Sequence, residues 1–207
     1  RAVEIARGRS IQDYQSAIAV AQKIRSNRAL YQNAQGKIAT WRDQIERIED
    51  QPILEQAVRL ANEGRLEPAI ATASQIRPNR ALYQEAQNDI QRWRNDLQAR
   101  ENLRNASQMA ESENVGALTQ AIAKARQALN SQTYRYQAER LMDQWSKQLY
   151  AIALQQANDN NLAAAINIAQ QIPSRSSVYR DVRTQIRQWQ DELTVDTEEV
   201  MEVDTED

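Results

Sequence analysis

Four tryptophans divide this chain at nearly regular intervals, and this spacing constrains its fold more than any other feature. Successive tryptophans are 52, 52 and 44 residues apart, and they lie at Trp41, Trp93, Trp145 and Trp189. A period of this length is typical of helical repeat proteins, in which stacked units bury one continuous core. The sequence therefore predicts a repeated surface and not a single pocket.

A short alanine-rich pattern precedes each tryptophan. In the second segment this pattern is Ala69-Ile70 with Ala73. The equivalent residues elsewhere are Ala17-Ile18 with Ala21, Ala121-Ile122 with Ala125, and Ala165-Ile166 with Ala169. Spacings of three and four residues place these side chains on one face of a helix. Because alanine allows two helix backbones to approach closely, each pattern predicts a short packing helix.

A turn is expected before each packing helix. Gly64, Gly116 and Asn160 each lie five residues before the aligned alanine. Glycine and asparagine tolerate the left-handed backbone conformation that ends many helices. We therefore expect these three residues to be left-handed, and we expect Gly8 to have the same role in the first segment.

A longer helix follows each packing helix and carries the tryptophan. In the second segment Tyr83, Ile90 and Leu97 form an apolar seam with the seven-residue spacing of a coiled coil. After the first tryptophan we expect the next helix to begin near Pro52, because proline favours the first turn of a helix. From about Tyr134 to Gln156 nothing interrupts the pattern, so we expect one continuous helix there.

The composition agrees with long helices joined by short turns, since the chain has only four glycines and four prolines. We predict an all-α fold, a right-handed α-solenoid of about four helical-hairpin repeats, with the long continuous helix between repeats three and four. The predicted array covers residues 1–193, with repeats at about 1–48, 52–100, 101–149 and 150–193. Residues 194–207 contain seven acidic groups and no Lys or Arg. We expect them to be a disordered tail, either a solubilising extension or an acidic motif that docks on a basic surface.

The second segment carries a resemblance to a known group of proteins. Its features are the turn at Gly64, the Ala69-Ile70-x-x-Ala73 step, the break from Ile76 to Tyr83, and the Ile90-x-x-Trp93 finish. Together they resemble helical repeats of cyanobacterial proteins that are loosely labelled as chromosome-segregation-ATPase-like, over roughly residues 1–193. The helix pairs are also similar to tetratricopeptide repeats, although those have a shorter unit of about 34 residues. The resemblance implies a scaffold or adaptor segment of a larger protein.

Several residue types and motifs that are common in enzymes and metal sites are missing from the sequence. The chain has no histidine, no cysteine and no glycine-rich phosphate loop. We therefore expect no enzymatic activity, no cofactor and no metal site. No stretch approaches the roughly 18 consecutive apolar residues of a membrane span. The compartment stays open, with the cytoplasm favoured and a membrane-anchored parent protein as the alternative.

The four tryptophans have two interpretations. Each occupies an apolar seam position with aliphatic residues three and four positions away, which favours a structural core over a ladder of ligand-binding platforms. Arginines beside them, such as Arg42 and Arg94, would suit nucleic acid. However, acidic neighbours such as Asp43 and Asp96 offer internal partners, so nucleic acid is the least favoured partner.

The prediction for function is a non-catalytic scaffold that binds a protein partner, whose identity stays open. The expected contact residues are arginines at the exits of the packing helices and tyrosines outside the repeated tyrosine position, namely Arg28, Arg80, Arg175, Tyr14, Tyr134, Tyr136 and Tyr150. Helix capping is the alternative role for the arginines. The alternative function is self-assembly into a homo-oligomeric rod through the heptad seams.

Overall fold

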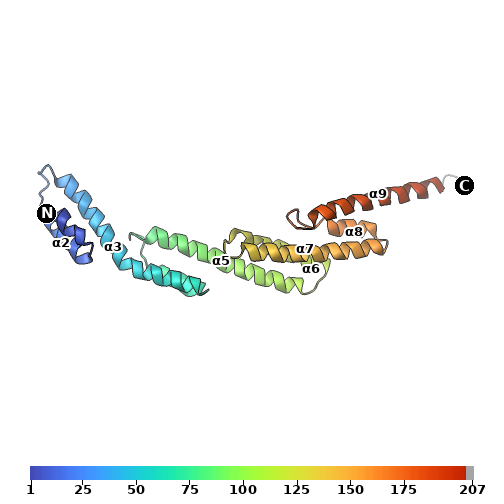
Figure 1. Cartoon of the computed structure of the whole chain (residues 1–207), viewed down its shortest axis with the longest axis horizontal. Helices are drawn as coiled ribbons and strands as arrows, with labels where there is room; N and C mark the ends of the chain where they lie inside the picture. The colour runs from blue at the N-terminus through green and yellow to red at the C-terminus, as the bar shows by residue number, and fades with distance from the viewer. Residues whose placement is uncertain (204–207) are drawn as a thin grey trace. The chain divides into compact units, whose positions relative to one another are not determined.

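A computed structural model describes the backbone of residues 1–203 and the side chains as far as residue 194. Within these residues all regular structure is helical, with nine α-helices, two 3-10 helices and no strand. The prediction of an all-α fold is confirmed. Contacts divide the chain into two compact units, Arg1–Arg94 and Asn95–Asp207, and the boundary falls within one helix, α5 (Figure 1).

The first unit contains short helices packed against one long helix. Its elements are α1 (Ala2–Ile5), η1 (Ala6–Gly8), α2 (Ile11–Ala21), α3 (Tyr31–Asn62), α4 (Leu66–Ala73) and the first part of α5 (Tyr83–Ala110). Both α2 and α4 pack against α3. At the α2 end the core joins Ala17 and Ala21 to Ile38 and Trp41. The small alanines let α2 approach α3 closely, and the larger side chains of α3 fill the space beside them.

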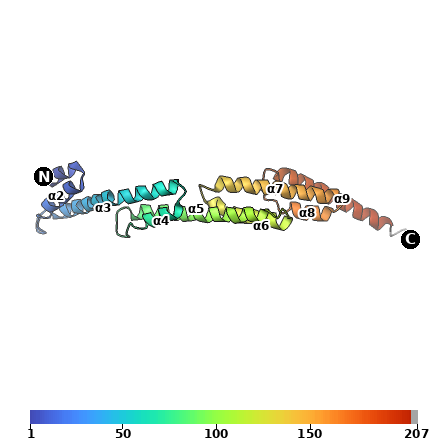
Figure 2. The ribbon, with the colours of Figure 1, turned by 90° about the horizontal axis from the view of Figure 1, so that it is seen from below.

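The second unit has one core shared by five helices. Its elements are the rest of α5, α6 (Val115–Arg126), η2 (Gln127–Asn130), α7 (Arg135–Asn158), α8 (Leu162–Ala169) and α9 (Tyr179–Val203). α7 packs against both α6 and α8, and α8 packs against α9 (Figures 1 and 2). Leu118, Leu149 and Val182 are completely buried in this core. The predicted tail, residues 194–207, begins inside α9, and its last four residues lie outside the described part of the chain.

Two long helices, α3 and α7, test the helix boundaries expected from the sequence. α7 runs from Arg135 to Asn158, which confirms the expected uninterrupted helix. The expected helix start near Pro52 is wrong, because Pro52 lies inside α3. Proline removes the backbone donor that would reach the carbonyl of Ile48. Both residues are exposed, so water can satisfy this carbonyl, while buried Leu54 and Ala57 hold the following turns in place.

Of the three residues expected to be left-handed before α4, α6 and α8, two have this conformation and one does not. Gly64 has φ +77° and Asn160 has φ +60°, so the prediction is confirmed for both. The prediction for Gly116 is wrong, because Gly116 lies inside the first turn of α6. Glu113, with φ +49°, is left-handed instead. The reason is that Asn114 caps α6 by accepting a hydrogen bond at 2.9 Å from the backbone of Ala117, which moves the turn three residues earlier.

In the first segment too, the left-handed residue is not the one expected from the sequence. Arg9, and not Gly8 as expected, has the left-handed conformation with φ +58°. Ser10 then caps α2 through a capping box with Asp13. A Cβ atom at Gly8 would collide with the Asp13 carboxylate, so this glycine makes room for the cap. In consequence α2 and α6 have 11 and 12 residues, whereas α4 and α8 have 8 each.

Candidate functional site

All four tryptophans lie inside the units. Trp41 and Trp93 in the first unit, and Trp145 and Trp189 in the second, are each at most 6% exposed. Trp41 shares a core with the small alanines of α2, and Trp145 and Trp189 share a core with those of α6 and α8. No indole among them presents an open face on which a ligand could stack.

The four tyrosines proposed as surface contacts have different environments. Tyr14 is only 7% exposed, so its expected role as a surface contact is wrong. It lies three residues before Ala17 and therefore shares the buried face of α2. Tyr134 and Tyr150 are half-buried against the second core, and burial raises the pKa of the Tyr150 hydroxyl. Tyr136 is 77% exposed.

The loop that leads into α5 is attached to the preceding long helix by an ion-pair cluster. The guanidinium of Arg80 donates to both carboxylate oxygens of Asp50, at 2.8 and 2.9 Å, and to Glu49 at 2.7 Å. The backbone N–H of Ala81 donates to the Glu46 carboxylate at 3.0 Å. Hydrogen bonds from Arg80 to Asp50, and then to Glu49, raise the pKa of Arg80. Arg80 therefore holds the fold together and is not free for a partner.

Carboxylates also hold the equivalent loops of the second unit, where hydroxyl groups replace the guanidinium. Asp96, on α5, accepts hydrogen bonds from Ser131 at 2.6 Å and Thr133 at 2.8 Å. Asp143, on α7, accepts from the hydroxyl of Ser176 at 3.2 Å and from the backbone N–H of Ser177 at 2.7 Å. Each loop is thus bound to the long helix that precedes it.

Asp143 is ionised by its surroundings. Partial burial raises its pKa, but hydrogen bonds from Lys147 and from the Ser177 backbone outweigh this effect and lower the pKa to about 2. The ammonium group of Lys147 lies 2.9 Å from the carboxylate. Opposite charge and donated hydrogen bonds both favour the charged form of an acid. Asp143 is therefore a structural carboxylate whose oxygens are already engaged.

The three arginines expected to contact a partner do not share one structural position. Arg28 and Arg80 each stand three residues before the tyrosine that opens a long helix, and Ser176 has this position before Tyr179. Arg175 is one residue earlier and exposed. Arg28 is exposed too, and within the described part of the chain its side chain makes no hydrogen bond or ion pair. The sequence aligned Arg175 with the others because only the tertiary contacts reveal the one-residue difference.

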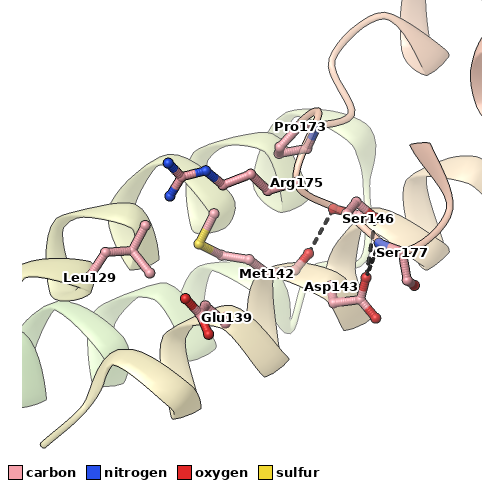
Figure 3. Close-up of a pocket in the computed structure, with 9 residues that line it drawn as sticks. Leu129, Glu139, Met142, Asp143, Ser146, Pro173, Arg175 and Ser177 are labelled. Carbon is pink, nitrogen blue, oxygen red and sulfur yellow. Dashed lines mark hydrogen bonds between the residues drawn. The ribbon is translucent and has the colours of Figure 1, made fainter. Parts of the chain in front are cut away.

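A groove in the second unit is the best candidate for a binding site (Figure 3). It has a volume of about 340 Å³ and lies between α7 and the loop that leads into α9. Leu129, Met142 and Pro173 supply its apolar surface, and Arg175 and Glu139 are its charged, exposed residues. The sequence predicted Arg175 as a contact residue but gave no signal for the apolar residues, since η2 and the proline loop are brought together only by folding.

The polar groups of the groove differ in their availability. Asp143 is engaged in the hydrogen bonds described above, and the hydroxyl of Ser146 donates to the Met142 carbonyl at 2.7 Å. Glu139 and Arg175 make no hydrogen bond or ion pair with other described residues. The groove therefore offers an apolar surface with two charges able to accept a ligand, and its serine and aspartate are already used to hold the loop.

The groove continues past Leu129 into a more basic area. This extension shares Leu129, Glu139, Met142, Pro173 and Arg175 with the groove and adds Arg126 and Arg135. Arg135 donates from Nε to the carbonyl of Leu129 at 3.0 Å, which leaves its charge uncompensated. Three arginines against one exposed glutamate give the rim a positive balance, which favours an acidic ligand.

No cluster of three or more metal-ligating side chains occurs among the described residues. Across the same part of the chain, no helix has both the length and the apolar character needed to cross a membrane. No family model, curated protein or solved structure matches this chain. The resemblance to cyanobacterial helical repeats accordingly stays a prediction.

Proposed function

We propose that this chain is a non-catalytic protein-interaction module, built as an α-solenoid, that binds an acidic, extended segment of a partner protein. The observation that carries the proposal is the groove beside α7, in which an apolar surface from Leu129, Met142 and Pro173 is bordered by uncompensated arginines. An apolar side chain of the partner would occupy the groove, and flanking carboxylates would pair with the arginines.

The chemistry of the groove supports binding over catalysis. Its aspartate and its buried serine are each committed to internal hydrogen bonds, Asp143 to the α9 loop and Ser146 to its own helix. The residues with free capacity are Arg175 and Glu139, which suit recognition of charge. Arginine is well matched to this role because its planar guanidinium binds carboxylates through two parallel hydrogen bonds.

A peptide selection tests this proposal. We would select a phage-displayed random peptide library on the immobilised chain and measure the affinities of enriched peptides by fluorescence anisotropy. The expected result is enrichment of sequences with an apolar residue between acidic residues, with binding weakened at least about tenfold by Arg175→Glu. Arg140→Glu is the matched control, because Arg140 is an exposed arginine of α7 that does not line the groove. Enriched peptides that bind equally to wild type and to Arg175→Glu would refute the groove as the site.

Self-assembly through the heptad seams receives less support. The seam residues Ile38, Trp41 and Ile90 are buried within their own unit, as is Trp145. Pairing of these seams between chains would have to expose each of them first, at a cost of about 1.5–3 kcal/mol per large apolar side chain. Association between copies would therefore need a different surface.

A further inference from the structure

The extension of the groove past Leu129 is rich in hydrogen-bond donors. Its polar side chains, all exposed, belong to Arg126, Arg135, Arg175, Asn130, Ser174 and Glu139. The three guanidinium groups, the amide and the hydroxyl can each donate to an anion, and only the glutamate is an acid. Three positive charges against one negative charge leave a positive excess of two. This surface is therefore suited to a ligand with more than one negative charge.

Folding brings the three arginines to this area from separate elements. Arg126 lies in the last turn of α6, Arg135 opens α7, and Arg175 belongs to the loop that enters α9. Figure 3 shows the Arg175 side chain directed from its loop towards Leu129, whose backbone carbonyl accepts the hydrogen bond from Arg135. None of the three forms an ion pair with another described residue. An anion bound here would therefore relieve their mutual repulsion.

Arg135 and Ser174 keep donors free for such a ligand. Arg135 donates from Nε to the Leu129 carbonyl at 3.0 Å, which orients its guanidinium and leaves both Nη groups available. In the loop that enters α9 the hydroxyl of Ser176 donates to Asp143, whereas the exposed hydroxyl of Ser174 makes no hydrogen bond within the part of the chain that the structure describes. Arg135 is thus oriented before a ligand arrives, and less side-chain entropy is lost on binding.

A phosphate monoester fits this set of donors better than a carboxylate does. At neutral pH it carries about 1.5–2 negative charges and has three acceptor oxygens, whereas a carboxylate has one charge and two oxygens. The charge of the phosphate nearly balances the positive excess, and arginine binds phosphate through paired, charge-assisted hydrogen bonds. Leu129, Met142 and Pro173 line both the extension and the groove, so an apolar side chain next to the phosphate would have an apolar surface to contact.

We propose that the ligand is a phosphorylated segment of a partner protein, in which a phosphoserine or phosphothreonine stands beside an apolar residue. The phosphate lies among Arg126, Arg135 and Arg175, and the apolar side chain occupies the groove against Met142. This inference rests on the proposed function, because it specifies the acidic group of the segment that the groove binds. Glu139 is the one opposing charge, and it weakens the binding of any anion here.

Oriented peptide libraries test the proposal. They share randomised positions on either side of a central residue, which is phosphoserine in the first library, glutamate in the second and serine in the third. Each library is passed over the immobilised chain, and retained peptides are sequenced by mass spectrometry. We expect retention from the phosphoserine library, with an apolar residue selected beside the centre. In fluorescence anisotropy the phosphoserine form of the selected sequence should bind at least about tenfold more tightly than its glutamate and serine forms.

Two substitutions should change this affinity in opposite directions. Arg126→Gln should weaken binding of the phosphoserine peptide at least about tenfold, because a charge-assisted hydrogen bond is lost. Glu139→Gln should strengthen it about threefold, because the opposing charge is removed. Arg140→Gln is the matched control, since it removes the same charge from an exposed arginine of α7 that lines neither the groove nor its extension. Circular dichroism establishes that each variant keeps its helices.

The pH dependence of binding separates phosphate from carboxylate. The second pKa of a phosphate monoester is about 6, so affinity for the phosphoserine peptide should rise between about pH 5.5 and 7.5 as the dianion forms. Affinity for the glutamate form should stay constant over this range. The chain has no histidine, the side chain whose ordinary pKa lies in this range, and the charged groups that face the phosphate are Arg126, Arg135, Arg175 and Glu139.

Equal affinity for the phosphoserine and glutamate forms would overturn this inference and leave the proposed function intact. Failure of all the libraries would overturn it too, and only failure of the phage selection as well would refute the proposed function. Equal losses in Arg126→Gln and Arg140→Gln would show a general effect of charge and no phosphate site. Displacement of the peptide by an equal concentration of inorganic phosphate, or of a single-stranded oligonucleotide, would assign the site to free phosphate or to nucleic acid instead.

Discussion

Carboxylates on the long helices decide how the loops of this protein are held. Asp50, Asp96 and Asp143 lie on long helices, and each accepts hydrogen bonds from the loop that enters the next long helix. Their donors differ, from a guanidinium in the first unit to hydroxyl and amide groups in the second. What recurs is an acidic acceptor on the helix, which accepts hydrogen bonds from donors of the loop.

Removal of the Arg80 side chain tests this role. Asp50 is only 6% exposed, and Arg80→Ala would leave its carboxylate buried without its cation. We expect a loss of about 3 kcal/mol in the free energy of unfolding, measured by urea denaturation.

Arg28→Ala is the matched control for this experiment, since it removes the same side chain from a loop of nearly the same sequence. We expect it to change the free energy of unfolding by less than about 0.5 kcal/mol. Equal effects of the two substitutions would contradict the structural role of the Arg80 cluster.

The pH dependence of the free energy of unfolding should reveal the lowered pKa of Asp143. Its folded-state pKa is lowered to about 2, below the ordinary value of 3.8. Its contribution is therefore complete above pH 4 and is lost as pH falls through about 2, because the unfolded chain binds the proton first. We expect Asp143→Asn to lower stability by about 2 kcal/mol at pH 6, with the difference from wild type shrinking towards pH 2 in urea denaturation. A difference that is constant between pH 6 and pH 2 would refute this.

Residue-scale prediction from the sequence was limited by contacts that no pattern encodes. The heptad positions indicated which face of each long helix is apolar, and the tryptophans are on that face. The sequence could not distinguish Arg28 from Arg80, because both stand in the same local motif. Only the presence of α3 beside the second loop makes one arginine structural and leaves the other exposed.

At the scale of elements, the ends of the helices depend on two local features. A left-handed residue ends a long helix, and a capping side chain starts the packing helix that follows. Gly64 and Asn160 end α3 and α7 in the left-handed conformation, which brings the next packing helix back within two or three residues. Where Ser10 or Asn114 supplies a strong N-cap, the packing helix begins earlier and is longer. Capping residues thus set the lengths of the packing helices.

Alanine substitution of two glycines separates these cases. Gly64→Ala should destabilise the chain by about 1 kcal/mol, because an L-residue is strained at φ +77°. Gly116→Ala should instead stabilise it by about 0.5 kcal/mol, since Gly116 is helical and a Cβ there meets only Asn114 at 3.5 Å. Thermal unfolding followed by circular dichroism measures both. Destabilisation by Gly116→Ala would instead support a left-handed turn at Gly116, as its position in the sequence suggested.

For the whole molecule, the division into two units implies that stability is distributed along the chain. Each unit has its own buried residues and two of the four tryptophans. In arrays of helices, stability is approximately a sum of local terms and nearest-neighbour contacts. Damage to one unit should then leave the other with a transition of its own.

A buried charge in the first unit tests this independence. Ala57 is completely buried on α3, so Ala57→Glu should unfold the first unit by placing an unpaired carboxylate in its core. In a background with Trp41→Phe and Trp93→Phe, the fluorescence of the remaining tryptophans should still show cooperative unfolding of the second unit. Ala39→Glu, at an exposed position of the same helix, is the control. Loss of the second transition in Ala57→Glu would show that the units unfold as one.

The sequence by itself determined the helical class, the apolar faces and the approximate positions of the turns, because helix periodicity and turn chemistry are local properties of neighbouring residues. Tertiary structure decided which helices extend past the boundaries expected from the sequence and which side chains are available to bind a partner. Pro52 lies inside a helix because packing on either side outweighs its lost hydrogen bond, and the groove beside α7 exists because two distant loops meet. Contacts between residues that are distant in the sequence cannot be predicted from residue spacing. Such contacts make Arg80 structural, and their absence leaves Arg28 exposed.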